Sequence, residues 1–449
     1  MRRHVLIGRF GPDDKIPVPR ARDEVASTLQ LSTGKNLDHG IGRALADLRA
    51  LKLTPSEIGV DLLVVAAHVH AADTRISRAT ESQDAWTREI RLVVPVSDPV
   101  KWSAAAPILV RTLNFLTGDR WNVGFRKRPK AFFETVPKSA QVPLIPPYDG
   151  VSLFSGGLDS LIGAIDSLQA GGKPLLVSHA GEGLVSKSQE LCFEGLKGAY
   201  KNVEFDRLRV WMNFEHGLIE DVGSEDTTRG RSFLFFSLGV AAGTALGQSF
   251  TLKVPENGLI ALNVPLDRLR LGALSTRTTH PFYMARWNEM LKALGIPGLV
   301  ENPYWNMTKG EMVKACANPT LLKQLAPLSL SCSSPTKGRW TKQPQGHCGH
   351  CLPCLIRRAS LGKNDTTPYN LPDLQARILN TNQAEGQQVR SFQVAIARLA
   401  ARPELAKILI HKPGPLYDFP DRQDDLAEVY RRGLEEVGRL IAGVRTAPL

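Results

Sequence analysis

Apolar residues in the middle of the chain recur in two alternating patterns. Four short apolar runs are typical of buried strands: 151–154, 175–178, 203–210 and 259–262. Between them, residues 158–168 carry apolar side chains on one helical face, and 232–246 form a strongly apolar helical segment. Strands that alternate with helices predict a parallel sheet covered by helices, and therefore an α/β domain over residues 147–365.

The preceding residues, 1–146, contain both the helical and the strand pattern of apolar residues. Two segments have a helical pattern and two have a strand pattern: 44–48 and 61–76, then 87–96 and 121–125. Three prolines between 142 and 150 mark a boundary. We therefore expect an N-terminal α+β domain that could dock a partner.

Residues 366–449 are expected to form a helical C-terminal region. Three segments there have the 3.6-residue period of an amphipathic helix: 373–379, 389–399 and 425–441. Several prolines separate these segments, which favours short helices joined by turns.

Composition argues against a membrane-spanning protein. The 449 residues are 43% hydrophobic and 22% charged, and no apolar run approaches the roughly 18 residues that span a membrane. The N-terminus has only a very short apolar run, which argues against a secretory signal and favours the cytoplasm. The net charge of +12 permits a nucleic-acid partner but does not favour one, because the basic residues are dispersed. The densest basic run, Arg126 to Lys130, is expected to be a solvated loop.

The strongest chemical signal lies between the first strand and the first helix of the central domain. It is the hexapeptide Ser155-Gly156-Gly157-Leu158-Asp159-Ser160. Unpaired amide groups and the helix dipole attract anions at such a turn, and two glycines let the backbone approach a polyphosphate. An aspartate at an anion site predicts a bound Mg²⁺. No lysine follows the glycines as it does in a Walker A loop.

This hexapeptide resembles the PP-loop of the ATP pyrophosphatases. The resemblance implies a Rossmann-like sheet of the adenine nucleotide alpha hydrolase type, with ATP at the carboxyl ends of the strands. It also implies attack of a substrate on the α-phosphorus, which yields an adenylated substrate and pyrophosphate. His179 ends the second predicted strand, so it lies near the nucleotide in this arrangement; a buried core histidine is the alternative.

Four of the six cysteines cluster near the end of the central domain: Cys332, Cys348, Cys351 and Cys354. In a cytoplasmic protein this spacing indicates a metal site before it indicates disulfides. Four thiolates suit a closed tetrahedral zinc site, which leaves no position for water and is therefore structural. An iron–sulfur cluster is the competing interpretation.

The PP-loop and the four cysteines together resemble the 7-cyano-7-deazaguanine synthase (QueC) family. The pair Ser331-Cys332, the run CGHCLPC that begins at Cys348, and Arg357 match the end of that family's catalytic domain. Arg231 is followed by Ser-Phe-Leu, and Lys309 follows a proline-led segment, as in that family. The resemblance covers roughly residues 150–362.

The resemblance implies that ATP activates 7-carboxy-7-deazaguanine, which then reacts with ammonia to form an amide and finally a nitrile. Asp159, Arg231 and Lys309 become the candidate catalytic residues, because developing phosphate charge needs positive groups and a metal. A solvated surface lysine is the alternative for Lys309. The stretch from Glu256 to Phe282 is expected to shape the site for the purine-like base.

The flanking regions depart from an ordinary QueC protein. Together with the altered stretch before Phe282 they resemble QatC, the QueC-like component of Qat anti-phage defence systems. That resemblance implies protein partners of the same defence operon, and the amine acceptor could be a partner protein's amine instead of ammonia.

Two other functions remain open from the sequence. One is tRNA modification by adenylation and sulfur transfer, which needs a reactive cysteine, whereas Cys192 and Cys316 have no visible partner. The other is a non-catalytic nucleotide-binding scaffold in a defence complex, against which the complete hexapeptide argues.

Overall fold

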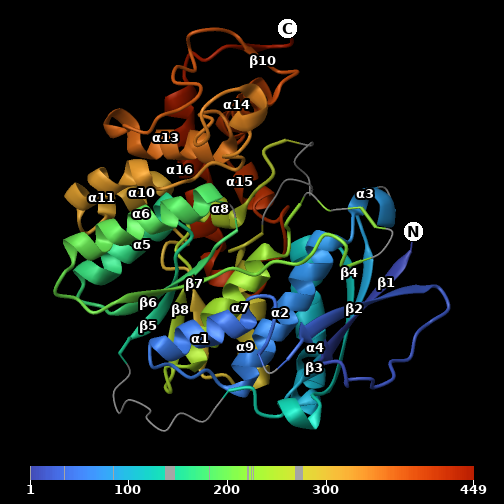
Figure 1. Cartoon of the computed structure of the whole chain (residues 1–449). Coiled ribbons are helices and arrows are strands. Elements are labelled where there is room, and N and C mark those ends of the chain that lie inside the picture. Colours follow the sequence, from blue (N-terminus) through green and yellow to red (C-terminus); the bar gives the residue numbers. More distant parts are fainter. Residues whose placement is uncertain are drawn as a thin grey trace.

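The computed structural model describes residues 2–449 apart from residues 35, 84, 137–146, 182, 220, 221, 224, 226 and 268–276. Most of the proline-marked boundary and part of the expected base-binding stretch therefore lie outside the described residues. Two parallel sheets flank an inner layer of helices, and the C-terminal helices form a third body above the second sheet (Figure 1).

The first sheet has the strand order β2-β1-β3-β4 and is parallel throughout. Its strands are Arg3–Phe10 (β1), Glu24–Ser32 (β2), Glu89–Val96 (β3) and Arg120–Lys127 (β4). Its helices are Ile41–Ala50 (α1), Glu57–Arg75 (α2), Arg78–Glu81 (α3) and Pro99–Thr117 (α4). The expected α+β domain is therefore wrong: the long helices connect parallel strands, so this part is of the α/β type.

The second sheet is also parallel, with the order β7-β6-β5-β8-β9. Its strands are Gly150–Leu153 (β5), Pro174–His179 (β6), Asp206–Val210 (β7), Phe250–Lys253 (β8) and Gly298–Glu301 (β9). Its larger helices are Leu158–Gln169 (α5), Gly183–Ala199 (α6), Arg231–Thr244 (α7) and Pro281–Leu294 (α9). The α/β class expected for this segment is confirmed, and the chain reverses its direction of winding between β5 and β8, where such sheets bind ligands.

One predicted strand is a helix. Residues 259–262 belong to the short helix α8, Gly258–Leu262. The Asn257 side chain accepts a hydrogen bond from the amide of Ile260 at 3.1 Å and so starts the helix. A short apolar run does not distinguish a buried strand from a buried helix, and β8 occupies the position that was assigned to this run.

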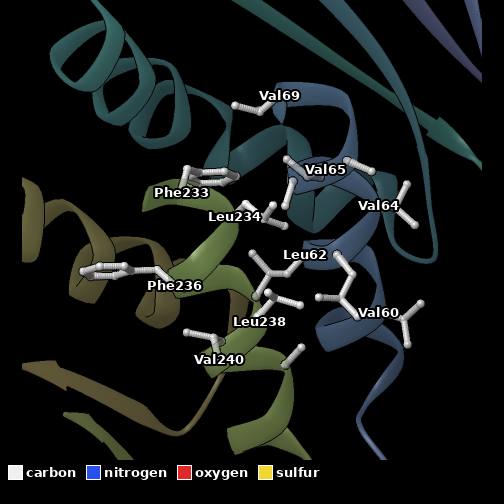
Figure 2. Close-up of a cluster of buried hydrophobic side chains, with 14 of the residues drawn as sticks. Val60, Leu62, Val64, Val65, Val69, Phe233, Leu234, Phe236, Leu238 and Val240 are labelled. Atoms are coloured by element: carbon white, nitrogen blue, oxygen red, sulfur yellow. The ribbon is translucent and has the colours of Figure 1, made fainter. Parts of the chain in front are cut away.

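The two sheets share one hydrophobic core. Helix α2 packs against α7 and α4 against α9, and one cluster of buried side chains includes Leu92 of the first sheet and Leu252 of the second. Figure 2 shows Leu62 of α2 and Leu238 of α7 at the centre of this contact. Both helices are apolar nearly all round because each packs against a sheet on one side and a helix on the other.

The basic run Arg126 to Lys130 is not a solvated loop. Arg128 is buried at the end of β4 and forms an ion pair with the buried carboxylate of Asp61 on α2. The same carboxylate accepts a hydrogen bond from the indole of Trp102 at 3.0 Å. The run is therefore partly internal, because it carries the cation that compensates a buried acid.

The C-terminal region packs around a second, smaller core, which also includes Leu259 and Leu355 of the central part. Its main helices are Ala384–Ala401 (α14), Leu405–Leu409 (α15) and Gln423–Ile441 (α16). The connecting helices are Lys309–Ala315 (α10), Pro319–Leu325 (α11), Gly338–Thr341 (α12) and Leu352–Leu361 (α13). The helix expected at 373–379 is absent there: Asp373 accepts a hydrogen bond from the Gln375 amide in a tight turn. Leu379–Asn380 (β10) then pairs with Thr446–Ala447 (β11).

Among the helices of the described residues, none has the length and apolar character needed to cross a membrane.

The shared core makes a prediction about unfolding. Leu234 of α7 is fully buried in the cluster of Figure 2, so Leu234→Ala should lower the free energy of unfolding by about 2 to 5 kcal/mol. Because one cluster joins the sheets, Trp102 and Trp287, which lie in different parts of it, should report the same shifted transition. Leu299→Ala is the control, because Leu299 is 48% exposed and its loss should cost below about 0.5 kcal/mol. Two separate transitions would contradict a shared core.

Candidate active site at the switch point

The loop after β5 has the geometry of an anion cradle. Gly156 has a φ of +80°, and a Cβ there would lie 2.9 Å from Cγ of Gln189, so only glycine fits. The hydroxyls of Ser155 and Ser160 lie 3.1 Å apart across the loop. Among the described side chains none caps the start of α5, so the amide groups of its first turn remain available to a ligand.

Asp159 joins three segments at this end of the sheet. Its carboxylate is buried and accepts hydrogen bonds from the side chain of Asn257 at 2.7 Å and from the Asn257 amide at 3.2 Å. The ammonium group of Lys309, also buried, lies 3.0 Å from the other carboxylate oxygen. The structure thus brings together two of the three catalytic candidates, and Lys309 is not a solvated surface lysine.

Glu256 was predicted only as the start of the stretch that shapes the base site, and its place beside Asp159 was not predicted. Burial and the neighbouring carboxylate of Asp159 raise the pKa of Glu256 to about 8, whereas Lys309 opposes this shift. Two carboxylates beside the glycine loop are suitable ligands for Mg²⁺, whose charge would favour their ionised forms. An acidic residue just after a strand is the signal that could have identified Glu256. The sequence predicted the strand at residues 259–262, after Glu256, whereas β8 lies before it.

The C-terminal region holds Lys309 in place. Thr308 caps α10 and forms a capping box with Glu311. Glu436 of α16 accepts hydrogen bonds from the Gly310 amide at 3.1 Å and from the hydroxyl of Thr308. Arg432, one turn earlier on α16, pairs with Glu311 at 2.7 Å. The helix that carries the lysine is therefore fixed at its first turn by another helix.

The remaining candidates, His179 and Arg231, lie side by side at the end of β6. A Cβ on Gly181 would lie 3.3 Å from the guanidinium of Arg231 and 3.8 Å from the imidazole of His179. Burial, and secondarily the charge of Arg231, lowers the pKa of His179 to about 3. The ring is therefore neutral at physiological pH, which is typical of a buried core histidine.

Arg231 begins a helix that the N-terminal segment positions. The preceding residue, Gly230, donates its amide to Asp73 of α2 at 2.7 Å. Asp73 also pairs with Arg88 at 3.0 Å and with Arg78 at 3.2 Å, and all three side chains are buried. A network of this kind holds its members rigidly because each buried charge has a partner.

The four cysteines converge on one point, as their spacing predicts. All four sulfur atoms lie within 4.8 Å of one another, with 3.9 Å between those of Cys332 and Cys351 and 4.0 Å between those of Cys348 and Cys354. Zinc–sulfur bonds of about 2.3 Å arranged tetrahedrally give sulfur–sulfur distances of about 3.8 Å. The cluster could therefore hold a metal ion such as zinc, and the short distances favour one ion over an iron–sulfur cluster, whose sulfides separate the thiolates.

The segment that carries the first cysteine also supports the glycine loop. The Leu330 amide, two residues before the first cysteine, donates to the carbonyl of Gly156 at 2.8 Å. The fully buried Arg357 donates to the hydroxyls of Ser329 at 2.9 Å and Ser331 at 3.2 Å, and so fixes both neighbours of Leu330.

Comparison of the sequence with protein-family models and with curated proteins finds no match. The chemistry must therefore be argued from the geometry. The loop offers amide groups to phosphates, Asp159 and Glu256 offer ligands to a divalent cation, and Lys309 offers a positive charge between them. This set of groups suits a reaction in which charge develops on a polyphosphate.

Replacement of one cluster cysteine should remove the metal. We expect Cys351→Ser to lose most of one equivalent of zinc, because a site with one thiolate fewer is no longer closed. Cys316→Ser is the control, since Cys316 is buried outside the cluster and its loss should leave the zinc content unchanged. Elemental analysis by mass spectrometry measures both. Iron with visible charge-transfer absorption in the parent protein would contradict the zinc assignment.

The raised pKa of Glu256 predicts a pH dependence of stability without magnesium. The native protein retains a proton on Glu256 up to a pH of about 8, whereas the unfolded chain releases it near the ordinary pKa of 4.5. The free energy of unfolding should therefore fall as the pH rises through this window. As the pH rises from about 5 to about 8, the unfolding temperature of Glu256→Gln should fall less than that of the parent protein. Added Mg²⁺ should reduce the fall in the parent protein. Equal losses in both proteins would refute the shift.

Proposed function

We propose that this chain is an ATP-dependent enzyme of the PP-loop class that activates a carboxylate by adenylation. The observation that carries the proposal is the contact between Asp159 and Lys309 beside the glycine loop, at the switch point of a parallel sheet. A buried acid and a buried lysine at this edge have a clear use in holding a magnesium-bound triphosphate.

Each group has a role in the proposed reaction. The substrate carboxylate forms a bond to the α-phosphorus of ATP, the bond to the bridging oxygen breaks, and pyrophosphate leaves with the electron pair. Bound Mg²⁺ neutralises phosphate charge, and Asp159 and Glu256 would hold it. Lys309 stabilises the negative charge that develops, and the loop amides orient the leaving phosphates.

We propose 7-carboxy-7-deazaguanine or a related 7-deazapurine as the substrate, because the loop and the four cysteines occur in the pattern of the QueC family. The large N-terminal and C-terminal regions support the QatC component of a Qat defence system in particular. Its amine acceptor is either ammonia, which leads to the amide and the nitrile, or an amine of a partner protein.

The test combines the purified protein with ATP, Mg²⁺, 7-carboxy-7-deazaguanine and ammonia, and follows nucleotide and pyrophosphate products. We expect Asp159→Asn and Lys309→Ala each to lower turnover at least about 100-fold, because each removes charge from the developing transition state. Lys314→Ala is the matched control: Lys314 lies exposed on the same helix, α10, and turnover should stay within about twofold.

A second arm replaces ammonia with candidate partner proteins and measures their masses. A mass increase that depends on Asp159 supports transfer to a protein amine. Absence of nucleotide turnover with every acceptor, from a protein that still binds ATP, would instead support the non-catalytic scaffold.

A further inference from the structure

A cavity of about 310 Å³, separate from the candidate active site, lies where three parts of the chain meet. The N-terminal part contributes Trp86 and the turn after α4, the central part contributes Arg229 and Arg277, and the C-terminal part contributes Lys412. None of the glycine-loop residues lines it, and neither do Asp159 or Lys309.

The lining of this cavity is cationic. Arg229, Arg277 and Lys412 supply three positive charges, and no aspartate or glutamate occurs among the described lining residues. Within the part of the chain that the structure describes, none of the three forms an ion pair. By contrast, the nearby buried Arg88 is paired with both Asp119 at 2.7 Å and Asp73 at 3.0 Å.

Aromatic rings and backbone carbonyls hold both guanidinium groups. Arg229 lies 4.0 Å from the ring centre of Trp86 and donates one N–H to the Thr117 carbonyl at 2.9 Å. Arg277 lies 4.7 Å from the ring centre of Phe115 and donates one N–H to the carbonyl of the same residue at 2.8 Å. Each guanidinium has five N–H donors, so most of them stay available to a ligand.

The environment penalises these charges in the free protein. Burial is the largest cause that lowers the pKa of Arg229, to about 10, and burial alone lowers that of Arg277. Buried cations usually have an anionic partner in the protein. Among the described residues no carboxylate pairs directly with either half-buried arginine, and Asp119 and Asp73 act on Arg229 only as secondary influences. Two positioned guanidinium groups without a direct anionic partner are the arrangement of a site that binds an anion.

We propose that this cavity is a phosphate-binding site, in which Arg229 and Arg277 hold a phosphate group through paired N–H···O bonds and Lys412 closes the site. Planar guanidinium groups match phosphate oxygens geometrically. A phosphate dianion neutralises more of the three charges than a single carboxylate does. The proposal does not depend on the proposed ATP chemistry, because the two sites share no residues.

Two short backbone segments connect this cavity to the candidate active site. Arg277 is two residues before Thr279, whose hydroxyl lies 3.5 Å from the Glu256 carboxylate. Arg229 is two residues before Arg231, the first residue of α7. A ligand that fixes both arginines would therefore order two segments that lead into the candidate active site.

The test is titration of the full chain with inorganic phosphate at constant ionic strength, by calorimetry and thermal unfolding. We expect one equivalent to bind and to raise the unfolding temperature. Arg229→Met with Arg277→Met should weaken binding at least about tenfold, because hydrogen bonds between charged groups are lost. Lys412→Ala, at an exposed position that leaves folding intact, should weaken it severalfold.

One control locates the site. Arg111→Met removes an exposed arginine already paired with Glu289 at 2.8 Å, and this variant should bind phosphate within about twofold of the parent. Ribose 5-phosphate and a 5′-phosphorylated trinucleotide then show whether the phosphate belongs to a small molecule or to a nucleic-acid end. Equal phosphate affinity of the parent and the arginine double variant, or acetate binding as tightly as phosphate, would overturn the proposal.

Discussion

The carboxylate of Asp159 is the group on which the arrangement around the glycine loop depends. A buried acid is tolerated only when hydrogen bonds and a cation compensate the loss of water. Here Asn257 supplies the hydrogen bonds and Lys309 the cation, so the loop after β5, the segment after β8 and the start of α10 must meet at one point. Glu256 belongs to the same cluster, where burial and the Asp159 carboxylate raise its pKa and Lys309 opposes this shift.

The flanking regions then act as parts of this site. Glu436 of the C-terminal region fixes the first turn of α10 and hence Lys309. Asp73 of the N-terminal region fixes Gly230 and hence the start of the helix that carries Arg231. Each region therefore positions one positively charged candidate residue. The N-terminal helices also share their hydrophobic core with the central sheet, so Asp73 is held at a fixed distance from Gly230.

Features encoded within a few residues could be predicted from the sequence, whereas those that need distant partners could not. The glycine loop and the closely spaced cysteines are local patterns, so their positions were predictable. The site roles of Glu256 and Glu436 were not predictable, because they depend on where β8 lies and on which helix packs against α10. The strands β1 and β2 were missed, and with them the parallel character of the first sheet. Short apolar runs give the same signal in a helix and in a strand, which is why residues 259–262 were misassigned.

The cysteine cluster lies apart from the carboxylates, yet the backbone connects the two. The Leu330 amide donates to the carbonyl of Gly156, and this hydrogen bond holds the peptide between Gly156 and Gly157 in the glycine loop. Arg357 holds the residues on either side of Leu330, and the cysteines begin immediately afterwards. A metal bound to the four thiolates would therefore keep Leu330 in contact with the glycine loop. The same stretch of chain carries Cys332 and holds the glycine loop, so a metal ion bound to the four thiolates would stabilise the loop without contacting it.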